Sequence, residues 1–336
     1  MVRTRTCLSL GGTRVDVWER EDVLEEIADR LQNPTEPPLF VASANLDHIS
    51  HFGARGSSRD LVDFSEPSIQ WLVLLDGVPL VWRSRRLLNA SVEQLAGSDL
   101  LEDVLEVGSR NSARVGIFGG APKTHDLLRR ALADTLTHLL VAECWAPTRD
   151  ELEDPARCRG LAEKVAAADI DLLVVALGKP RQEYFLAEYG LLTGVRVAVA
   201  FGAAIDFLTG QVHRAPRHVR HAGLEWLWRL VQEPQRLAKR YLVAGPPGAA
   251  ALLRDSRVLW TDGLAPDSLP QPRKSARAVV PGPASGQGEW SGVERRLAAR
   301  RSGCAATRMT LGVIPEQRHD ERRARTDRRV RVVAEV

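Results

Sequence analysis

Short apolar runs that stop at a glycine recur along the middle of this chain. Three of them lie in residues 113–126, 171–183 and 195–210, and each passes from the glycine directly into polar residues. Uninterrupted apolar runs of this length are typical of parallel β-strands that are buried on both faces. The carboxyl ends of such strands line the ligand-binding edge of a sheet. The pattern therefore predicts a parallel sheet with a binding site at its carboxyl edge.

Further strands and helices are predicted around these three runs. A hairpin is expected at 8–18, where Gly11-Gly12 is the turn signal. The other expected elements are strands within 37–49 and 68–76 and helices at 21–31 and near 99–110, 124–135 and 156–168. Strands and helices that alternate at this spacing predict an α/β fold with a mostly parallel, Rossmann-like sheet flanked by helices. We place this core at residues 1–210.

The composition changes after the core. Residues 211–245 are predicted to form a basic helical appendage, in which arginine and lysine are interleaved with tryptophan, leucine and tyrosine. Residues 246–336 are predicted to be a linker and a largely disordered tail, because 265–292 is rich in proline, serine and glycine and the remainder is dense in arginine. The arginine clusters can bind acidic lipid or nucleic acid, or can belong to a solvated tail.

Composition narrows the class of protein. The net charge of +3 is too small to indicate nucleic-acid binding, so no nucleic-acid partner is expected. The four cysteines are far apart and show neither metal-site spacing nor a disulfide framework, which favours free thiols in a reducing cytoplasm. The amino terminus lacks the apolar core of a signal peptide, and no apolar run reaches the roughly 18–20 residues that cross a bilayer. We expect a soluble or peripheral protein without a metal ion or cofactor.

The first candidate site joins the ends of two predicted strands. Ser43 and Asn45 follow one apolar run, and Asp76-Gly77 follows the next. In a parallel sheet these residues share one edge. There the carboxylate of Asp76 can act as a general base, Asn45 can hydrogen-bond a sugar or nucleotide, and Gly77 lets a ligand approach closely. In the alternative interpretation, Asp76 caps the next helix and Asn45 fills a turn.

A glycine-rich loop is the second candidate. Gly119 and Gly120 lie between a strand and a predicted helix, so their loop can offer backbone N–H groups to a phosphate. The loop matches neither of the common nucleotide-binding motifs, and an ordinary turn explains it equally well.

The third candidate is the segment that begins at Gly178. Pro180 is expected to start a helix, and the neighbouring lysine and arginine can hold a diphosphate. Gln182 and Glu183 can contact a sugar or a base. The alternative is a capped helix in which Glu183 favours the positive end of the helix dipole.

Asp206 and the appendage complete the candidates. Asp206 follows the third glycine-ended strand, where it can orient a ligand hydroxyl or serve as a buried capping residue. Arg214, Arg217 and Arg220 can bind a diphosphate through paired N–H donors. Basic helices that carry tryptophan often lie at a membrane interface. The alternative is a helix packed on its own domain, with tryptophan in the core and arginine in solvent.

In combination, these residues resemble the WecG/TagA/CpsF family, glycosyltransferase family 26, over residues 8–243. Separated motifs occur in the family's order: Ser43-x-Asn45, DGVPLVW (76–82), GSDL (97–100), FGG (118–120), LGKPRQE (177–183), FGAAIDFLTG (201–210), RAP (214–216) and GLEWLWRL with EPQRLAKRYL (223–242). The last block is the most specific of them.

The resemblance implies a compact α/β enzyme that moves a sugar from a UDP-sugar to an undecaprenyl-diphosphate-linked acceptor. The implied sugar is N-acetylmannosamine or a related one, and the product serves teichoic acid, capsule, exopolysaccharide or common-antigen synthesis. The implied reaction is inverting and metal-independent, with Asp76 as the base. The family's basic appendage closes over the site and meets the membrane. We therefore expect a peripheral protein on the cytoplasmic face of the plasma membrane, with a homo-oligomer as an open possibility.

The chain departs from the family pattern at two positions. Ser43 stands where threonine is frequent, which retains the hydroxyl, and Gln94 stands where an arginine is common, which changes the expected acceptor contacts. The segment beyond 245 lies outside the resemblance. The competing interpretation is a Rossmann-like nucleotide-binding or redox protein without glycosyl transfer. It is weakened because the chain lacks GxGxxG and a ribose-binding acid about 20 residues further on.

Overall fold

The computed structural model describes residues 5–136, 138–212, 215–216, 219, 225–238, 242–243 and 245–261. Its strands are β1 (Thr6–Leu10), β2 (Thr13–Val17), β3 (Leu39–Ala44), β4 (Gln70–Leu75), β5 (Arg114–Gly119), β6 (Leu140–Trp145), β7 (Leu172–Ala176), β8 (Val197–Ala200) and β9 (Arg257–Thr261). Its helices are α1 (Arg20–Gln32), α2 (Leu46–Phe52), α3 (Val78–Leu88), α4 (Gly97–Arg110), α5 (Pro122–Thr135), α6 (Arg149–Glu153), α7 (Pro155–Ala167), α8 (Arg181–Tyr189), α9 (Ala204–Leu208), α11 (Glu225–Gln232), α12 (Pro234–Ala238) and α13 (Gly245–Arg254), with 3-10 turns at Arg59–Leu61 and Gly190–Thr193.

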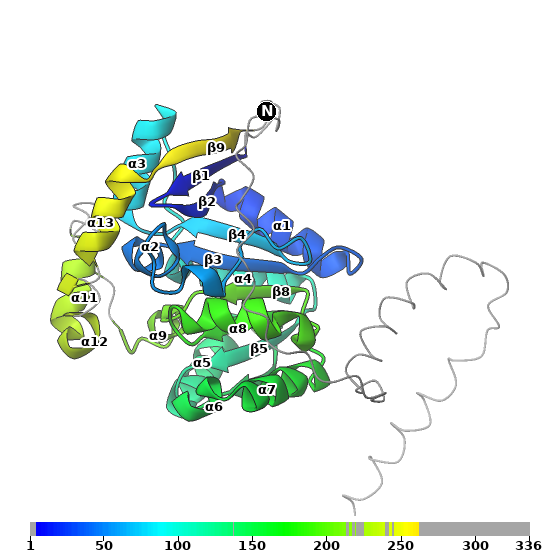
Figure 1. Cartoon of the computed structure of the whole chain (residues 1–336). Helices are drawn as coiled ribbons and strands as arrows, with labels where there is room; N and C mark the ends of the chain where they lie inside the picture. Colours follow the sequence, from blue (N-terminus) through cyan, green and yellow to red (C-terminus); the bar gives the residue numbers. More distant parts are fainter. Residues whose placement is uncertain are drawn as a thin grey trace, which may run out of the picture. The chain divides into compact units, whose positions relative to one another are not determined.

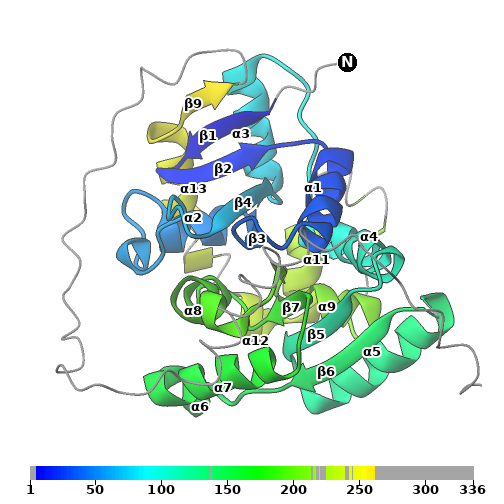
Figure 2. The same cartoon turned by 90° about the vertical axis from the view of Figure 1, so that its right-hand side faces the viewer.

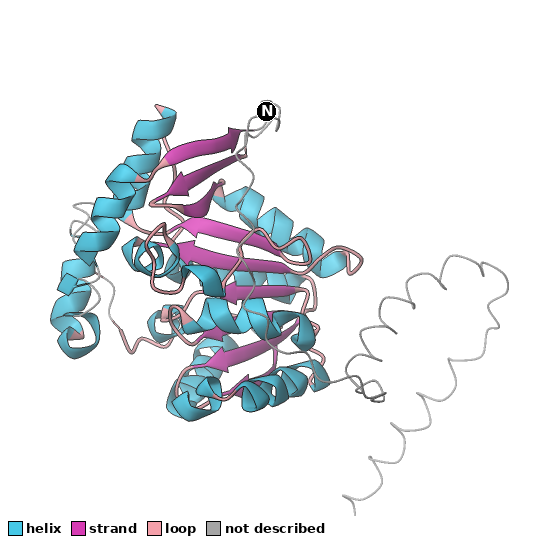
Figure 3. Cartoon of the chain, in the orientation of Figure 1, coloured by secondary structure: helices cyan, strands magenta, loops and turns pink. Residues whose placement is uncertain are grey.

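The strands form one sheet in the order β6-β5-β7-β8-β3-β4-β2-β1-β9 (Figure 1). Neighbours from β6 to β2 run parallel, whereas β1 is antiparallel to both β2 and β9. Helices cover both faces of this sheet (Figure 3). The predicted α/β fold, with a mostly parallel sheet flanked by helices, is confirmed.

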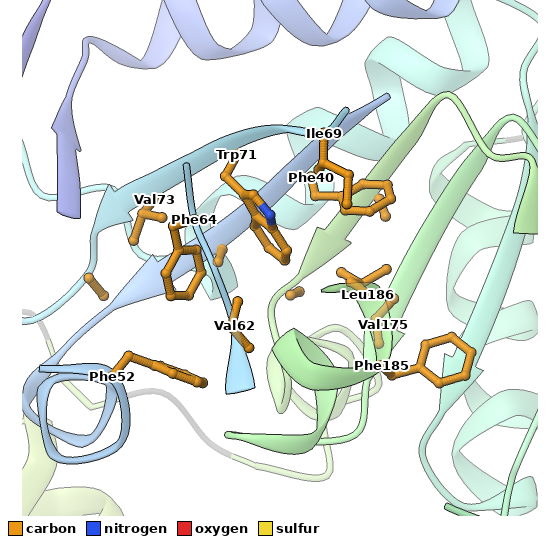
Figure 4. Close-up of a cluster of buried hydrophobic side chains, with 14 of the residues drawn as sticks. Phe40, Phe52, Val62, Phe64, Ile69, Trp71, Val73, Val175, Phe185 and Leu186 are labelled. Atoms are coloured by element: carbon orange, nitrogen blue, oxygen red, sulfur yellow. The ribbon is translucent and has the colours of Figure 1, made fainter. Parts of the chain in front are cut away.

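Each face of the sheet has its own hydrophobic cluster. One cluster includes Phe40 and Trp71, whose rings meet edge-on at 5.5 Å (Figure 4). Residues of α2, α3, α7, α8 and α13 belong to this cluster. The other cluster packs against α1, α4, α5 and α9. Figure 2 shows α1, α4 and α5 on one side of the sheet and α2, α7 and α8 on the other. The helices that follow β5 and β8 thus lie opposite those that follow β7 and β3, which is the arrangement that places ligands at the carboxyl ends of the strands.

Two segments differ from the sequence-based prediction. No strand was predicted at β6, an edge strand that is only half-buried and whose apolar run is broken by Glu143. Residues 246–261, predicted as part of a linker and tail, form most of α13, which begins at Gly245, and all of β9 instead. β9 pairs with β1, and α13 packs so closely on α2 that a Cβ on Gly248 would lie 2.7 Å from the Leu46 carbonyl oxygen. The prolines after Gly245 suggested a turn, but proline is equally suited to the first turn of a helix.

The predicted appendage is described in part. α11 and α12 are helical, as expected for this segment. Arg214, Arg217 and Arg220 lie outside the described residues, and so does the predicted tail from residue 262 onward. The limits of the appendage and of the tail stay predictions. Within the described part of the chain, no helix has the length and apolar character to span a membrane.

Candidate functional site

The ends of β3 and β4 bring an amide and a carboxylate together. The strands pair with Ala44 opposite Leu75, so Asn45 and Asp76 are the next residues of each. Asn45 Nδ2 donates to Asp76 Oδ2 at 3.1 Å. The backbone N–H groups of Asp76 and Gly77 both donate to the Ala44 carbonyl, at 3.0 and 3.1 Å. The pair is therefore positioned by the sheet itself, which makes it rigid.

The amide of Asn45 is fixed at both ends. Its Oδ1 accepts the backbone N–H of His48 at 3.2 Å and caps α2, which leaves Nδ2 for the carboxylate. The cap of α3 is Gly77, so Asp76 does not occupy the capping position of the alternative interpretation. Asn45 and Asp76 are both partly exposed. A carboxylate thus faces the edge of the sheet beside an amide that orients it.

Three neighbours shape the surroundings of this pair. A Cβ on Gly77 would lie 3.1 Å from both Cα and Cβ of Asn45, so glycine permits the close approach of the two loops. The side-chain amide of Gln94 donates to the Asp76 carbonyl, in the region where the family resemblance led us to expect an arginine. Ser43 is buried in β3, two residues before Asn45. Sequence reasoning did not anticipate that Gln94 would hold the Asp76 backbone.

The glycine-rich loop follows β5 at the same edge. Gly119 has φ +104° and Gly120 has φ +80°, and a Cβ on Gly119 would lie 2.6 Å from the carbonyl of Ala176 in β7. His125 Nε2 lies 2.7 Å from the Gly119 carbonyl oxygen and donates to it, because a carbonyl can only accept. The loop leads into α5, whose first N–H groups can receive an anion. His125 thus holds the backbone of the glycine-rich loop in place. The sequence did not predict this role, because its only signal is a histidine five residues after Gly120.

The segment after β7 uses its polar side chains internally. Gln182 is buried, accepts from Gly178 N at 3.2 Å and donates to the Ala200 carbonyl at 2.7 Å. It therefore ties the end of β7 to the end of β8. Glu183 is fully buried and also bonds to protein groups, so in this structure both side chains build the loop that carries Gly178 and Pro180. Gly178 and Pro180 are partly exposed at the sheet edge.

A cluster of buried ionisable groups underlies this edge. Lys179 Nζ pairs with Glu183 Oε1 at 2.7 Å, and both side chains are almost fully buried. The fully buried ring of His48 lies near Lys179. Burial, the positive charge of Lys179 and that of His51 hold the pKa of His48 well below its usual 6.5. His48 is therefore neutral at physiological pH, and Lys179 is the cation of this cluster.

Asp206 lies in α9, the short helix after β8. It is partly buried, and its carbonyl accepts from Val212 N and Thr209 Oγ1, each at 3.2 Å. The next residue, Phe207, receives the guanidinium of Arg229 over its ring at 5.2 Å. Helix α11 of the appendage therefore contacts the element that carries Asp206.

The candidate residues share the carboxyl edge of the sheet but not one point on it. Three strand steps separate β4 from β7 and four separate β4 from β5. At about 4.8 Å a step, Asp76 lies about 14–19 Å from the loops at Gly178 and Gly119. Such a spacing suits a long ligand with its reacting end near Asp76. Among the described residues, no group of three His, Cys, Asp or Glu side chains is arranged to hold a metal ion.

Comparison with known proteins adds a family to this geometry. The model of the "Glycosyl transferase WecG/TagA/CpsF family" matches residues 8–261. The match extends through α13 and β9, so the resemblance does not stop near 245 as the motifs suggested. A relative from Bacillus spizizenii, named N-acetylglucosaminyldiphosphoundecaprenol N-acetyl-beta-D-mannosaminyltransferase, is 30% identical over 186 residues, which are 55% of this chain and 69% of the relative.

Proposed function

The chain belongs to the WecG/TagA/CpsF family of glycosyl transferases and is a hexosyltransferase, and from this premise we propose its substrates and mechanism. The proposed donor is a UDP-sugar carrying N-acetylmannosamine or a related sugar. The proposed acceptor is a sugar linked to polyprenyl diphosphate, because the relative's name specifies such an acceptor. Family membership also favours sugar transfer over the redox alternative.

Asp76 is the proposed general base, and its bond to Asn45 is the observation that carries the proposal. The acceptor hydroxyl gives its proton to the Asp76 carboxylate while its oxygen forms a bond to the sugar's anomeric carbon. The bond from that carbon to the diphosphate breaks on the opposite face, so the configuration inverts and UDP leaves with the bonding electrons. A single oriented carboxylate suffices for this displacement.

The leaving diphosphate requires positive charge or N–H donors. The loop at Gly119 and Gly120 and the first turn of α5 lie about 19 Å from the end of β4, four strand steps away, so their backbone N–H groups suit the nucleoside end of the donor and are too far to contact a diphosphate that leaves beside Asp76. We propose that the nucleotide end of the donor lies over β5 and β7 and that its sugar reaches toward β3 and β4. Arg214, Arg217 and Arg220 are proposed to meet the diphosphate in place of a metal ion.

The proposed setting is the cytoplasmic face of the plasma membrane, to which the protein binds peripherally. A polyprenyl chain keeps the acceptor in the bilayer, so the enzyme must present its sheet edge to the lipid surface. The product is proposed to be a precursor of a cell-envelope polysaccharide. A homo-oligomer remains compatible with this arrangement.

The test compares Asp76→Asn with the wild-type enzyme. UDP release is measured with UDP-N-acetylmannosamine and a short-chain, water-soluble polyprenyl-diphosphate acceptor. We expect Asp76→Asn to lose about 10²–10⁴ in turnover, the usual contribution of a general base, while UDP binding is retained. Asp150→Asn, an exposed carboxylate on α6, is the matched control and should be fully active.

Three outcomes would overturn parts of the proposal. Near-normal turnover by Asp76→Asn removes Asp76 from the base role. Activity that disappears in EDTA and returns with magnesium contradicts the metal-independent mechanism. Retention of the anomeric configuration in the product contradicts the single displacement.

A further inference from the structure

Two helices beside the Asp76 loop expose apolar and cationic side chains that the reaction does not use. α3 begins at Val78, two residues after Asp76. Its solvent face carries Pro79, Trp82 and Arg86, and α13 exposes Pro246, Leu253 and Arg254; these six residues are called the α3–α13 surface. Trp82 is 63% exposed and Leu253 is 69% exposed, an unusual degree for side chains of this size.

The exposed apolar residues of the α3–α13 surface form one stripe on each helix. Pro79, Trp82 and Arg86 are spaced by three and four residues, so they lie on one face of α3. Pro246 and Leu253 are seven residues apart, two turns along α13. Each helix thus exposes apolar side chains together with an arginine, the residue types that occur in helices at a lipid interface.

The two stripes are adjacent in the folded protein. Arg83 Nη2 donates to the carbonyl of Leu253, the penultimate residue of α13, at 3.3 Å. The other side of α13 is packed on α2, the helix that Asn45 caps. Figure 1 shows α3 and α13 next to one another. The two stripes therefore lie on adjacent helices, of which α3 begins two residues after Asp76 and α13 packs on the helix that Asn45 caps.

The charge of this patch has one sign. Residues 78–88 and 245–254 contain four arginines (Arg83, Arg85, Arg86 and Arg254) and no acidic residue. A patch that combines exposed tryptophan and leucine with an excess of cations is complementary to a layer of anionic lipid headgroups, and the exposed Asp255 is the first acidic residue after α13. Leu242 and Val243, shortly before α13, are also more than half exposed.

We propose that the α3–α13 surface docks the core of the protein onto an anionic lipid layer. Trp82 and Leu253 enter the headgroup region, and Arg86 and Arg254 meet lipid phosphates. The inference deepens the proposed function and rests on it, because an acceptor held in the bilayer must reach Asp76 from the lipid side. The core thus has a membrane contact of its own, separate from the appendage.

The experiment measures sedimentation of the full chain with vesicles of equal parts phosphatidylglycerol and phosphatidylcholine. We expect Trp82→Ser/Leu253→Ser to bind about tenfold or more weakly. Arg86→Gln and Arg254→Gln should each bind about fivefold more weakly, an effect absent from pure phosphatidylcholine vesicles. The matched controls are Leu140→Ser, half exposed on the opposite edge strand β6, and Arg159→Gln, exposed on α7; both should bind like the wild type.

Activity separates this inference from the function on which it rests. With the water-soluble acceptor, the docking variants should release UDP at the wild-type rate, whereas with a long-chain acceptor in vesicles they should be slower by the factor lost in binding. If the wild type transfers to neither acceptor, the proposed function fails, and the vesicle measurement still decides whether the surface binds lipid.

Equal vesicle binding by the docking variants and the wild type would overturn the proposal. A dimer that Trp82→Ser dissociates, together with unchanged vesicle binding, would assign the surface to a second copy of this chain instead. Thermal unfolding of each variant confirms folding, since the substituted side chains are exposed.

Discussion

Asn45 serves two functions with one side chain, and both depend on where its strand ends. Its oxygen caps α2, and its nitrogen donates to the carboxylate of Asp76. An aspartate in its place could cap the helix but could not donate to the carboxylate. This dual use explains why an amide suits the position better than the other residues that cap helices.

Two variants of Asn45 separate these functions. Asn45→Ser retains a capping oxygen but is too short to reach Asp76, whereas Asn45→Ala loses both bonds. We expect kcat to fall about tenfold to a hundredfold in both variants, because Asp76 is no longer oriented. Only Asn45→Ala should also lose about 1 kcal/mol of stability. UDP release and urea unfolding measure the two effects, and a fully active Asn45→Ser variant would exclude a positioning role.

His48 predicts how stability depends on pH. Its pKa is lowered in the folded protein from 6.5, so the unfolded chain binds a proton that the folded chain does not. The stabilisation from its neutral ring is complete above the unfolded pKa and is lost as the pH falls below it. Because only the unfolded chain binds this proton, His48 should lower the free energy of unfolding by up to about 1.4 kcal/mol for each pH unit below 6.5.

The measurement is urea unfolding from about pH 7 to about pH 5. The variant His48→Gln should lack this part of the slope, whatever its stability at pH 7. His138→Gln, an exposed histidine, is the control and should retain the wild-type slope. A wild-type slope no steeper than that of His48→Gln would show that the ring is protonated in the folded state.

At the scale of elements, neighbouring strands end in close contact at the carboxyl edge of the sheet, where Gly119 of β5 pairs with Ala176 of β7. Gly119 leaves β5 against the carbonyl of Ala176, and Gln182 ties the loop after β7 to the last residue of β8. The contact between β5 and β7 requires a glycine at position 119, and the link between β7 and β8 requires the buried hydrogen bond of Gln182. They hold the glycine-rich loop in place before any ligand binds.

Alanine substitution at two glycines tests the close contact between Gly119 and the backbone of Ala176. Gly119→Ala combines φ +104° with a Cβ 2.6 Å from the backbone of Ala176, and backbone cannot move aside as a side chain can. We expect a loss of about 2–4 kcal/mol in stability. Gly160→Ala, in α7 with open space around its Cα, should instead gain about 0.5–1 kcal/mol. Thermal unfolding measures the stability of both variants. Equal stability of Gly119→Ala and the wild type would contradict the close contact between Gly119 and Ala176.

At the scale of the whole molecule, the last described strand, β9, lies beside the first, β1. β9 pairs with β1 across almost the entire described sequence, and Thr6 bonds Thr261 through their hydroxyl groups at 3.4 Å. Helix α13 buries Leu252 and Ala251 against the cluster that also contains β1. The segment after the appendage is therefore part of the core.

Truncation of the chain tests whether α13 and β9 belong to the core. A chain that ends after residue 244 lacks α13 and β9 and should lose about 3 kcal/mol or more of stability, since Leu252 and its neighbours lose their buried positions. A chain that ends after Thr261 retains every described element and should unfold at the same urea concentration as the full chain. Lower stability of this longer truncation would contradict the prediction that residues from 262 onward form a tail.

The sequence by itself determined most of the local structure. Each parallel strand from β3 to β8 was predicted from its apolar run, except β6, a half-buried edge strand whose apolar run is broken by Glu143. The residues at the strand ends were predicted for the same reason, because Asn45, Asp76, Gly119 and Gly178 directly follow an apolar segment. These signals are local, since the apolar run of a strand and the glycine or polar residue after it are adjacent in the sequence.

Only the tertiary structure decided which of these residues meet. The register of β3 and β4 places Asn45 beside Asp76, and the adjacency of β7 and β8 turns Gln182 inward. β9 finds β1 although the turn-like start of α13 suggested a linker. Strand order, register and the pairing of buried polar groups are set by packing among residues distant in sequence, so no local pattern contains them.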